Sequence, residues 1–139
     1  MTTSARRWIL LLLALTAAYT GSWATLAPQA WFDAFPGFGH HWLPILGPYD
    51  EHLARDTGGL FLALCALSIG AAFRAADGFL VRLAGVCWLV FSIPHTIYHF
   101  RHLDMYDTTD AVLNVVGLAA ILVLAAVLLL PARAKPTTA

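Results

Sequence analysis

The chain has 139 residues, of which 60% are hydrophobic and only 12% are charged, and its formal net charge is zero. A soluble domain is about half apolar and a quarter charged, so this composition, with a mean hydropathy of +0.73, excludes an ordinary soluble globular protein. The sequence also lacks basic runs and glycine-rich phosphate loops, which argues against nucleic-acid and nucleotide partners. It therefore predicts one integral membrane domain in contact with the lipid bilayer.

Four apolar segments have the length and composition of membrane-spanning helices. A hydrocarbon core of about 30 Å needs about 20 helical residues, and backbone polar groups in lipid must be paired within the segment. None of the segments alternates with period two, as a barrel strand would. We predict an all-α, four-transmembrane-helix bundle with helices near residues 8–27, 57–73, 81–102 and 109–130.

The first apolar segment has an alternative interpretation as a secretory signal peptide. The stretch MTTSARRWILLLLALTAAYTGSWA ends in a small-x-small pattern at Ser22, Trp23 and Ala24. Cleavage there would leave three helices and an extracellular amino terminus. The apolar stretch is long for a signal peptide, so we expect a retained helix.

The connection at residues 28–56 is the one long loop in the prediction. Four prolines interrupt it, and its aromatic residues are Trp31, Phe32, Phe35, Phe38, Trp42 and Tyr49. Aromatic side chains favour the lipid headgroup region, so an interfacial belt is one interpretation and a lid over a site is the other. We expect short helical or re-entrant pieces over the outer mouth of the bundle.

Basic residues concentrate at one end of the predicted bundle. That end has Arg6, Arg7, Arg74, Arg82, Arg133 and Lys135. The opposite end has only Arg55 and Arg101, so the positive-inside rule predicts that both termini are cytoplasmic. A composition rich in Ala, Leu, Arg and Trp with a single lysine fits a high-GC bacterium. We therefore expect a multi-pass protein of the bacterial inner membrane.

Three histidines lie at the outer end of the third predicted helix. His95, His99 and His102 stand at i, i+4 and i+7 and share one helical face. Pro94 removes the donor that would pair with the carbonyl of Val90. The pattern predicts a polar pocket or a bound water beside His95.

The fourth predicted helix has a matching series of Asp107, Asp110 and Asn114. Because the turn between helices is short, antiparallel packing would put three pairs at equal depth. These pairs are His102 with Asp107, His99 with Asp110, and His95 with Asn114.

The second predicted helix adds His52 and Asp56, with Arg55 beside them. Titratable residues within a membrane are candidates for function, and imidazole with carboxylate suits zinc, copper or iron. We predict a divalent metal site, structural or catalytic, with candidate ligands His95, His99, Asp110, His52 and Asp56. Supporting residues would be His102, Asp107, Asn114 and Arg55. Alternatives are a structural His–Asp network that joins the helices, a proton pathway, and a pH-sensing or ligand-binding outer pocket.

The segment Ala54–Gly70, ARDTGGLFLALCALSIG, has an arginine before a glycine pair at the start of a membrane helix. With the four-helix layout, it resembles the DoxX-like family of small bacterial membrane proteins. That resemblance implies a membrane subunit of a quinone or thiol redox complex, with a redox partner. A homo-oligomer and a purely structural protein stay open as alternatives.

Overall fold

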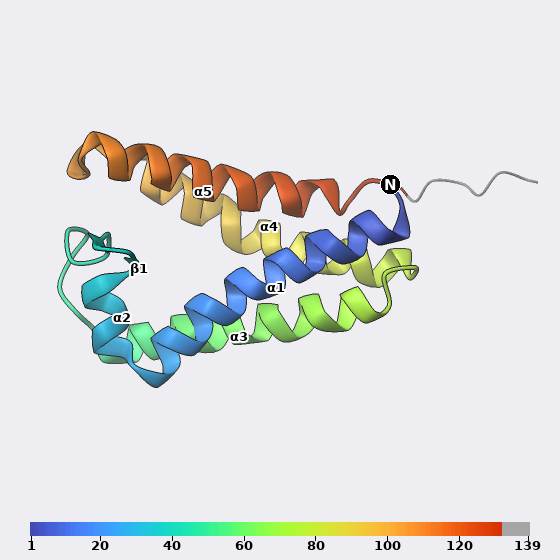
Figure 1. Ribbon diagram of the computed structural model, residues 1–139, viewed down its shortest axis with the longest axis horizontal. Helices are drawn as coiled ribbons and strands as arrows, with labels where there is room; N and C mark the ends of the chain where they lie inside the picture. Colours follow the sequence, from blue (N-terminus) through green and yellow to red (C-terminus); the bar gives the residue numbers. More distant parts are fainter. Residues whose placement is uncertain (132–139) are drawn as a thin grey trace, which may run out of the picture.

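The computed structural model describes residues 1–131, so Arg133 and Lys135 of the predicted basic end lie outside the described residues. Four of its helices are long and apolar enough to cross a membrane. They are α1 (Thr3–Leu26), α3 (Glu51–Phe73), α4 (Gly78–Phe100) and α5 (Thr108–Val127). The prediction of an all-α, four-helix fold is confirmed, and the four apolar helices fit an integral multi-pass membrane protein (Figure 1).

Side-chain caps determine where the long helices begin. Asp50, Asp77 and Asp107 each accept a hydrogen bond from a backbone N–H in the first turn of the following helix. The second membrane helix therefore begins at Glu51 rather than near residue 57, because its first turns are polar and lie outside the apolar stretch. Such polar turns belong to the helix but not to its membrane-spanning part.

The four long helices form two antiparallel pairs, α1 with α3 and α4 with α5. Figure 1 shows α3 and α4 diverging from the turn that joins them, so the pairs are farther apart at the end opposite to the amino terminus. The closest approach of α1 to α3 involves Gly21 and Gly58. A Cβ atom on Gly58 would lie 2.3 Å from the Thr25 hydroxyl oxygen.

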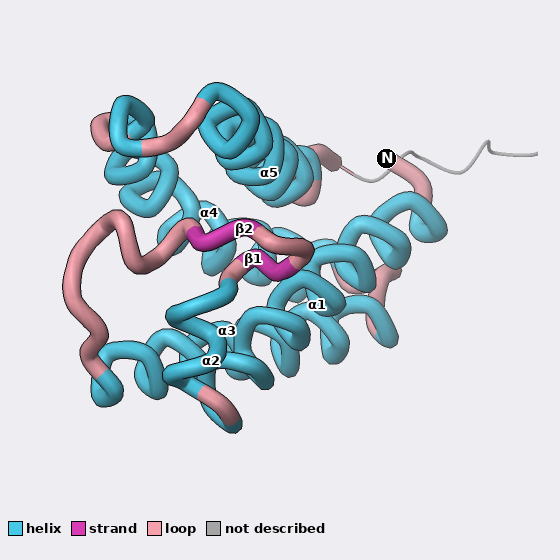
Figure 2. The backbone as a smooth tube through the Cα atoms, turned by 60° about the vertical axis from the view of Figure 1, so that its left-hand side comes forward, coloured by secondary structure: helices cyan, strands magenta, loops and turns pink. Residues whose placement is uncertain are grey.

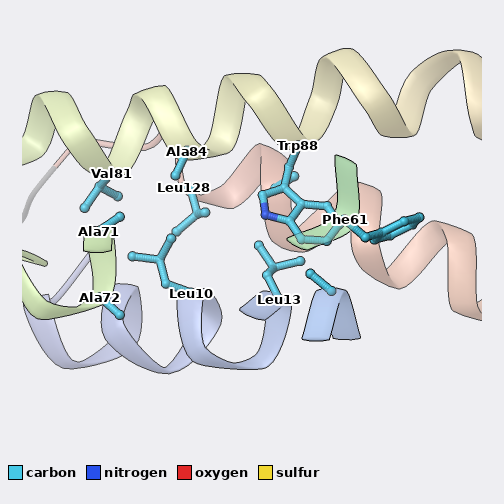
Figure 3. Packing of buried hydrophobic residues seen from close by; sticks show 11 residues of the cluster. Leu10, Leu13, Phe61, Ala71, Ala72, Val81, Ala84, Trp88 and Leu128 are labelled. Atoms are coloured by element: carbon cyan, nitrogen blue, oxygen red, sulfur yellow. The ribbon is translucent and has the colours of Figure 1, made fainter. Parts of the chain in front are cut away.

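A hydrophobic core closes the bundle near the amino terminus. Leu10 and Leu13 of α1, Trp88 of α4 and Leu128 after α5 are completely buried there (Figure 3). The indole Nε1 of Trp88 donates a hydrogen bond of 2.9 Å to Ser68. This core ties the two helix pairs together at one end only.

Basic side chains cap helix ends next to this core. The guanidinium of Arg6 donates to the carbonyl of Leu130, and that of Arg7 donates to the carbonyl of Ala72. Cations stabilise helix C-termini through the helix dipole. The first two arginines therefore join the start of α1 to the ends of α5 and α3.

The long connection folds into a compact cap at the opposite end of the bundle. It contains α2 (Pro28–Ala34) and a two-stranded antiparallel hairpin, β1 (Pro36–Gly37) with β2 (His40–His41). The Tyr19 hydroxyl of α1 donates to the carbonyl of Pro36 at 2.9 Å. Figure 2 shows the hairpin between α1 and α5. The expected short helical piece is present, whereas the hairpin was not predicted.

Candidate functional site

A cavity of about 500 Å³ lies between the two helix pairs and beneath the cap. All four long helices contribute to its wall, and the connection at residues 28–50 covers it. Sites for small molecules typically measure about 300–1,000 Å³ and are mostly apolar. The diverging half of the bundle, beneath the cap, therefore contains a space of the size that small molecules occupy.

Aromatic rings of the cap form the roof of the cavity. Trp31 and Phe35 have ring centroids 5.8 Å apart, and Phe35 and Trp42 are 6.2 Å apart in an edge-to-face arrangement. Trp42 in turn contacts Tyr106, in the turn between α4 and α5, at 6.4 Å. Of the two interpretations of the aromatic loop, this position over the cavity favours the lid.

Apolar side chains form the floor. Phe61 of α3 and Phe91 of α4 meet edge to face at 4.9 Å, and Leu118 and Ile121 of α5 complete this level. Ile121 is about 20 Å below the outer end of its helix, at 1.5 Å per residue. The deepest part of the cavity is therefore hydrocarbon in character.

Between the roof and the floor lies a polar belt, which we define as Ser92, His95, Thr96, His99 and Asn114. The first four come from α4 and Asn114 comes from α5. They lie within about 12 Å of the outer ends of their helices. The belt therefore combines three of the sequence-predicted residues, His95, His99 and Asn114, with two that were not predicted.

Several polar atoms in the cavity wall are buried without a hydrogen-bond partner. Asn114 is only 1% exposed, and its side-chain oxygen is unpaired. The hydroxyls of Ser92 and Thr96 and the indole Nε1 atoms of Trp31 and Trp42 are also unpaired. Each buried unpaired group costs about 1–3 kcal/mol. Residues 1–131 therefore leave these side-chain atoms of the cavity wall without a hydrogen-bond partner.

The two belt histidines form a series of ring contacts with aromatic neighbours. The His95 ring stacks on Phe91 with centroids 5.0 Å apart, and it meets His99 at 4.6 Å. Nδ1 of His99 lies 3.5 Å from the Tyr106 hydroxyl, which also donates to the carbonyl of Trp42 at 3.3 Å. Neither His95 nor His99 forms an ion pair within residues 1–131.

Tyr106 lies outside the membrane-spanning helices, where the turn meets the cap. Burial raises the pKa of Tyr106 from its ordinary value of 10.0 to about 12. The phenol therefore stays protonated at neutral pH and keeps its hydroxyl as a donor.

The predicted ladder between α4 and α5 does not form as a set of contacts. In the part of the chain that the structure describes, none of its three pairs makes a hydrogen bond or an ion pair. Asp107 caps α5, and Nδ1 of His102 contacts the carbonyl of Tyr98. Asp110 contacts a side chain of the hairpin. Two residues at equal depth on neighbouring helices do not form a pair when other groups lie closer to them.

The partner of Asp110 is His40 from the hairpin, which the sequence did not indicate. Nδ1 of His40 lies 2.5 Å from Oδ1 of Asp110. That oxygen is buried and has no further partner within residues 1–131. It joins the cap to the start of α5.

The predicted residues of α3 lie on its exposed side. Nε2 of His52 is 3.2 Å from Asp56, with side chains 89% and 59% exposed. Arg55 bonds to Glu51 and to the carbonyl of Thr25. These side chains are outside the cavity, because the helix presents Ala54, Thr57 and Phe61 to it instead.

The five predicted metal ligands are consequently divided among separate locations. His95 and His99 are in the belt, Asp110 contacts the hairpin, and His52 and Asp56 are on the surface. No group of three or more His, Cys, Asp or Glu side chains among residues 1–131 is arranged to hold a metal ion. The structure therefore offers no assembled donor set for zinc, copper or iron in that range.

Sequence reasoning missed Ser92 and Thr96, although a signal was present. Ser92, Thr96 and His99 stand at i, i+4 and i+7, the same spacing as His95, His99 and His102. The face of α4 that carries Ser92 and Thr96 is the one that lines the cavity. Trp31 and Trp42 could not be found this way, because their position depends on how the cap folds.

Comparison with known proteins adds no relative from which a role could be transferred. No protein-family model, no curated protein and no solved structure matches this chain, so its function has to be argued from the cavity itself.

Proposed function

We propose that this chain is an integral membrane protein that binds a small lipid-soluble molecule in the cavity between its two helix pairs. The observation that carries the proposal is the set of buried, unpaired polar atoms in an otherwise apolar wall, above all the side-chain oxygen of Asn114. Native proteins rarely leave such groups unsatisfied. A bound molecule would supply the missing partners.

Water alone is a poorer occupant of this cavity. A volume of about 500 Å³ would take on the order of 15 water molecules at about 30 Å³ each, and each needs two to four polar partners. The roof and floor are aromatic and aliphatic, so most of these waters would face hydrocarbon. A molecule with an apolar body and a few polar atoms fits both parts of the wall.

We further propose that the cavity faces the outer side of a bacterial inner membrane and that the amino terminus is cytoplasmic. The support is the position of Arg6, Arg7, Arg74 and Arg82, which gather at the end opposite to the cavity.

The proposal is tested by identifying what the purified protein retains. Wild-type protein and the Asn114→Leu variant, of similar size, would be purified in nanodiscs, extracted with organic solvent and compared by mass spectrometry. The matched control is Val116→Leu, because Val116 lies on the same helix and is 60% exposed. We expect a molecule that is enriched in the wild type and the control and at least tenfold depleted in Asn114→Leu. Identical extracts from all three proteins would reject the proposal.

A role as a DoxX-like redox subunit is a second candidate. It is supported by the resemblance of Ala54–Gly70 and by the His95–Phe91 stack, which offers a flat aromatic surface to a quinone ring. A quinone in the wild-type extract, or a redox partner that co-purifies, would favour it. The thiol part of that role has less support, because Cys65 and Cys87 are both free and unpaired with each other.

Metal binding is a third candidate, supported only by the closeness of the His95 and His99 rings. Two imidazoles at i and i+4 can share one ion, but further ligands would have to come from elsewhere. Elemental analysis of untagged protein beside a His95→Ala/His99→Ala variant tests it. Stoichiometric zinc, copper or iron that disappears in the variant would favour the metal site over the lipid-soluble ligand.

A further inference from the structure

We infer that the ligand of the cavity is electrically neutral and carries a hydroxyl, carbonyl or amide group on a hydrocarbon body. This inference rests on the proposed function and specifies the chemical class of the bound molecule. It is drawn from the charges near the cavity, the chemistry of the belt and the position of the opening.

Charged side chains are almost absent from the cavity wall. Among its lining residues in the described chain, the one Asp, Glu, Lys or Arg is Asp50, at the rim. Its carboxylate is exposed and already accepts the backbone N–H of Leu53. An anionic ligand would therefore be buried without an opposite charge, and a cationic ligand would meet only the exposed carboxylate of Asp50, and burial of an unpaired charge is very costly in a medium of low dielectric constant.

Two side-chain pairs at the cap end of the bundle lie outside the cavity wall. His40 and Asp110 contact each other above it, and Arg55 is held by Glu51 on the outer surface of α3. Neither pair has a side chain in the lining. These two pairs therefore provide no charge in the wall that could recognise a charged headgroup.

The belt and the roof instead offer neutral hydrogen-bonding groups. The indole N–H groups of Trp31 and Trp42 are donors, the Asn114 oxygen is an acceptor, and the hydroxyls of Ser92 and Thr96 can act as either. These groups complement an alcohol, a carbonyl or an amide. With the apolar floor beneath them, they fit a polar group near one end of a hydrocarbon body.

The opening of the cavity is placed for access from lipid. Leu53 of α3 and Tyr98 of α4 both line the cavity and are 64% and 45% exposed. They belong to the two helices that diverge toward the cap (Figure 1). Because Leu53 is in the polar first turn of α3, an uncharged molecule in the lipid headgroup region could enter between these two residues.

The test compares three matched probes in nanodiscs that hold the full chain. The probes are 8-bromo-1-octanol, 8-bromooctane-1-sulfonate and 8-bromooctyltrimethylammonium, which differ only in headgroup and charge. Bromine quenches tryptophan fluorescence at short range, and Trp31 and Trp42 lie in the wall. Binding to a site gives quenching that saturates, whereas partition into lipid gives quenching that rises linearly.

We expect saturable quenching by the alcohol alone, at least tenfold weaker in Asn114→Leu and unchanged in Val116→Leu. Saturable quenching by either ionic probe at similar concentration would overturn the inference of a neutral ligand and leave the proposed binding function intact. Equal saturation by the alcohol in Asn114→Leu would also overturn it, because the belt would not be the site. If all three probes quench only linearly, the inference fails, and the extraction experiment decides separately whether the cavity binds any molecule.

Discussion

Asn114 illustrates how the role of a single residue depends on what its neighbours already do. It belongs to the series with Asp107 and Asp110 that the sequence placed opposite the histidines. The two aspartates have partners, a backbone N–H in one case and His40 in the other. Asn114 lies deeper and is 1% exposed, and its side-chain oxygen has no hydrogen-bond partner within residues 1–131.

At the same scale, Tyr106 gives a prediction for alkaline pH. Its pKa is raised by burial to about 12 in the folded protein and is about 10 when unfolded. The folded state therefore holds this proton more tightly. The stabilisation is complete below pH 10 and is lost as the pH rises through 12. We expect the stability of wild type to fall more steeply across this interval than that of Tyr106→Phe.

Thermal unfolding of both proteins between pH 9 and 12 measures this difference. Tyrosinate absorbance should also show a component titrating near pH 12 that is missing from Tyr106→Phe. Parallel stability curves for the two proteins would contradict the burial of Tyr106.

Arg6 gives a second prediction for a single residue. It is 1% exposed and donates to the carbonyl of Leu130 at the end of the last helix. Arg6→Gln should lower the free energy of unfolding by about 1–3 kcal/mol, because that carbonyl loses a charged donor. Arg82→Gln, an exposed arginine near the same end, is the control and should change stability by less than about 0.5 kcal/mol. Both substitutions would be measured by denaturant titration in detergent. Equal effects would argue against the stabilising role of the hydrogen bond from Arg6 to the carbonyl of Leu130.

At the scale of helices, the neighbouring glycines of α3 have different environments. A Cβ on Gly58 would clash with the Thr25 hydroxyl and lie 2.7 Å from the Thr25 backbone nitrogen, whereas nothing is within 4 Å of one on Gly59. The sequence indicated close approach at this pair, as small residues do between membrane helices. Only the structure distinguishes the glycine at the contact from the glycine facing outward.

This difference predicts opposite effects of the same substitution. Gly58→Ala should destabilise the protein by about 1–3 kcal/mol, because the α1 backbone must move. Gly59→Ala should be neutral or stabilising by up to about 1 kcal/mol, because alanine is the better helix former. Unfolding of both variants in the same detergent measures the two changes. A tolerated Gly58→Ala would show that α1 and α3 are not in contact at this point.

The cap is the element for which the sequence was least informative. Its composition predicted short helical or re-entrant pieces with an aromatic belt or lid. The structure adds a hairpin, in which Gly37 and Gly39 adopt positive φ angles that glycine accommodates easily. Its location depends on the Tyr19–Pro36 hydrogen bond and the His40–Asp110 contact. These join residues 17 and 70 positions apart, which no local pattern relates.

For the whole molecule, the proposed orientation predicts which loops a reagent can reach from outside the cell. In a Cys65→Ser/Cys87→Ser background, single cysteines would replace exposed Asp104 between α4 and α5, or exposed Ala76 between α3 and α4. A membrane-impermeant maleimide should label Asp104→Cys on intact cells and label Ala76→Cys only after permeabilisation. The reverse labelling pattern would contradict the proposed orientation. It would place the amino terminus outside the cell and the cavity on the cytoplasmic side.

The sequence by itself determined the class of protein, the number of membrane helices and the concentration of basic residues at one end of the bundle. These properties follow from the hydrophobic length and local composition of each segment, because a segment's insertion into a bilayer depends on these two quantities. The tertiary structure decided which polar residues meet. His52 lies on the exposed side of α3, and Asp110 contacts His40 of the hairpin. Because the helix pairs also diverge, the predicted metal ligands are separated. Helical phase and competition among distant partners control these outcomes, and neither is contained in the spacing of residues along one helix.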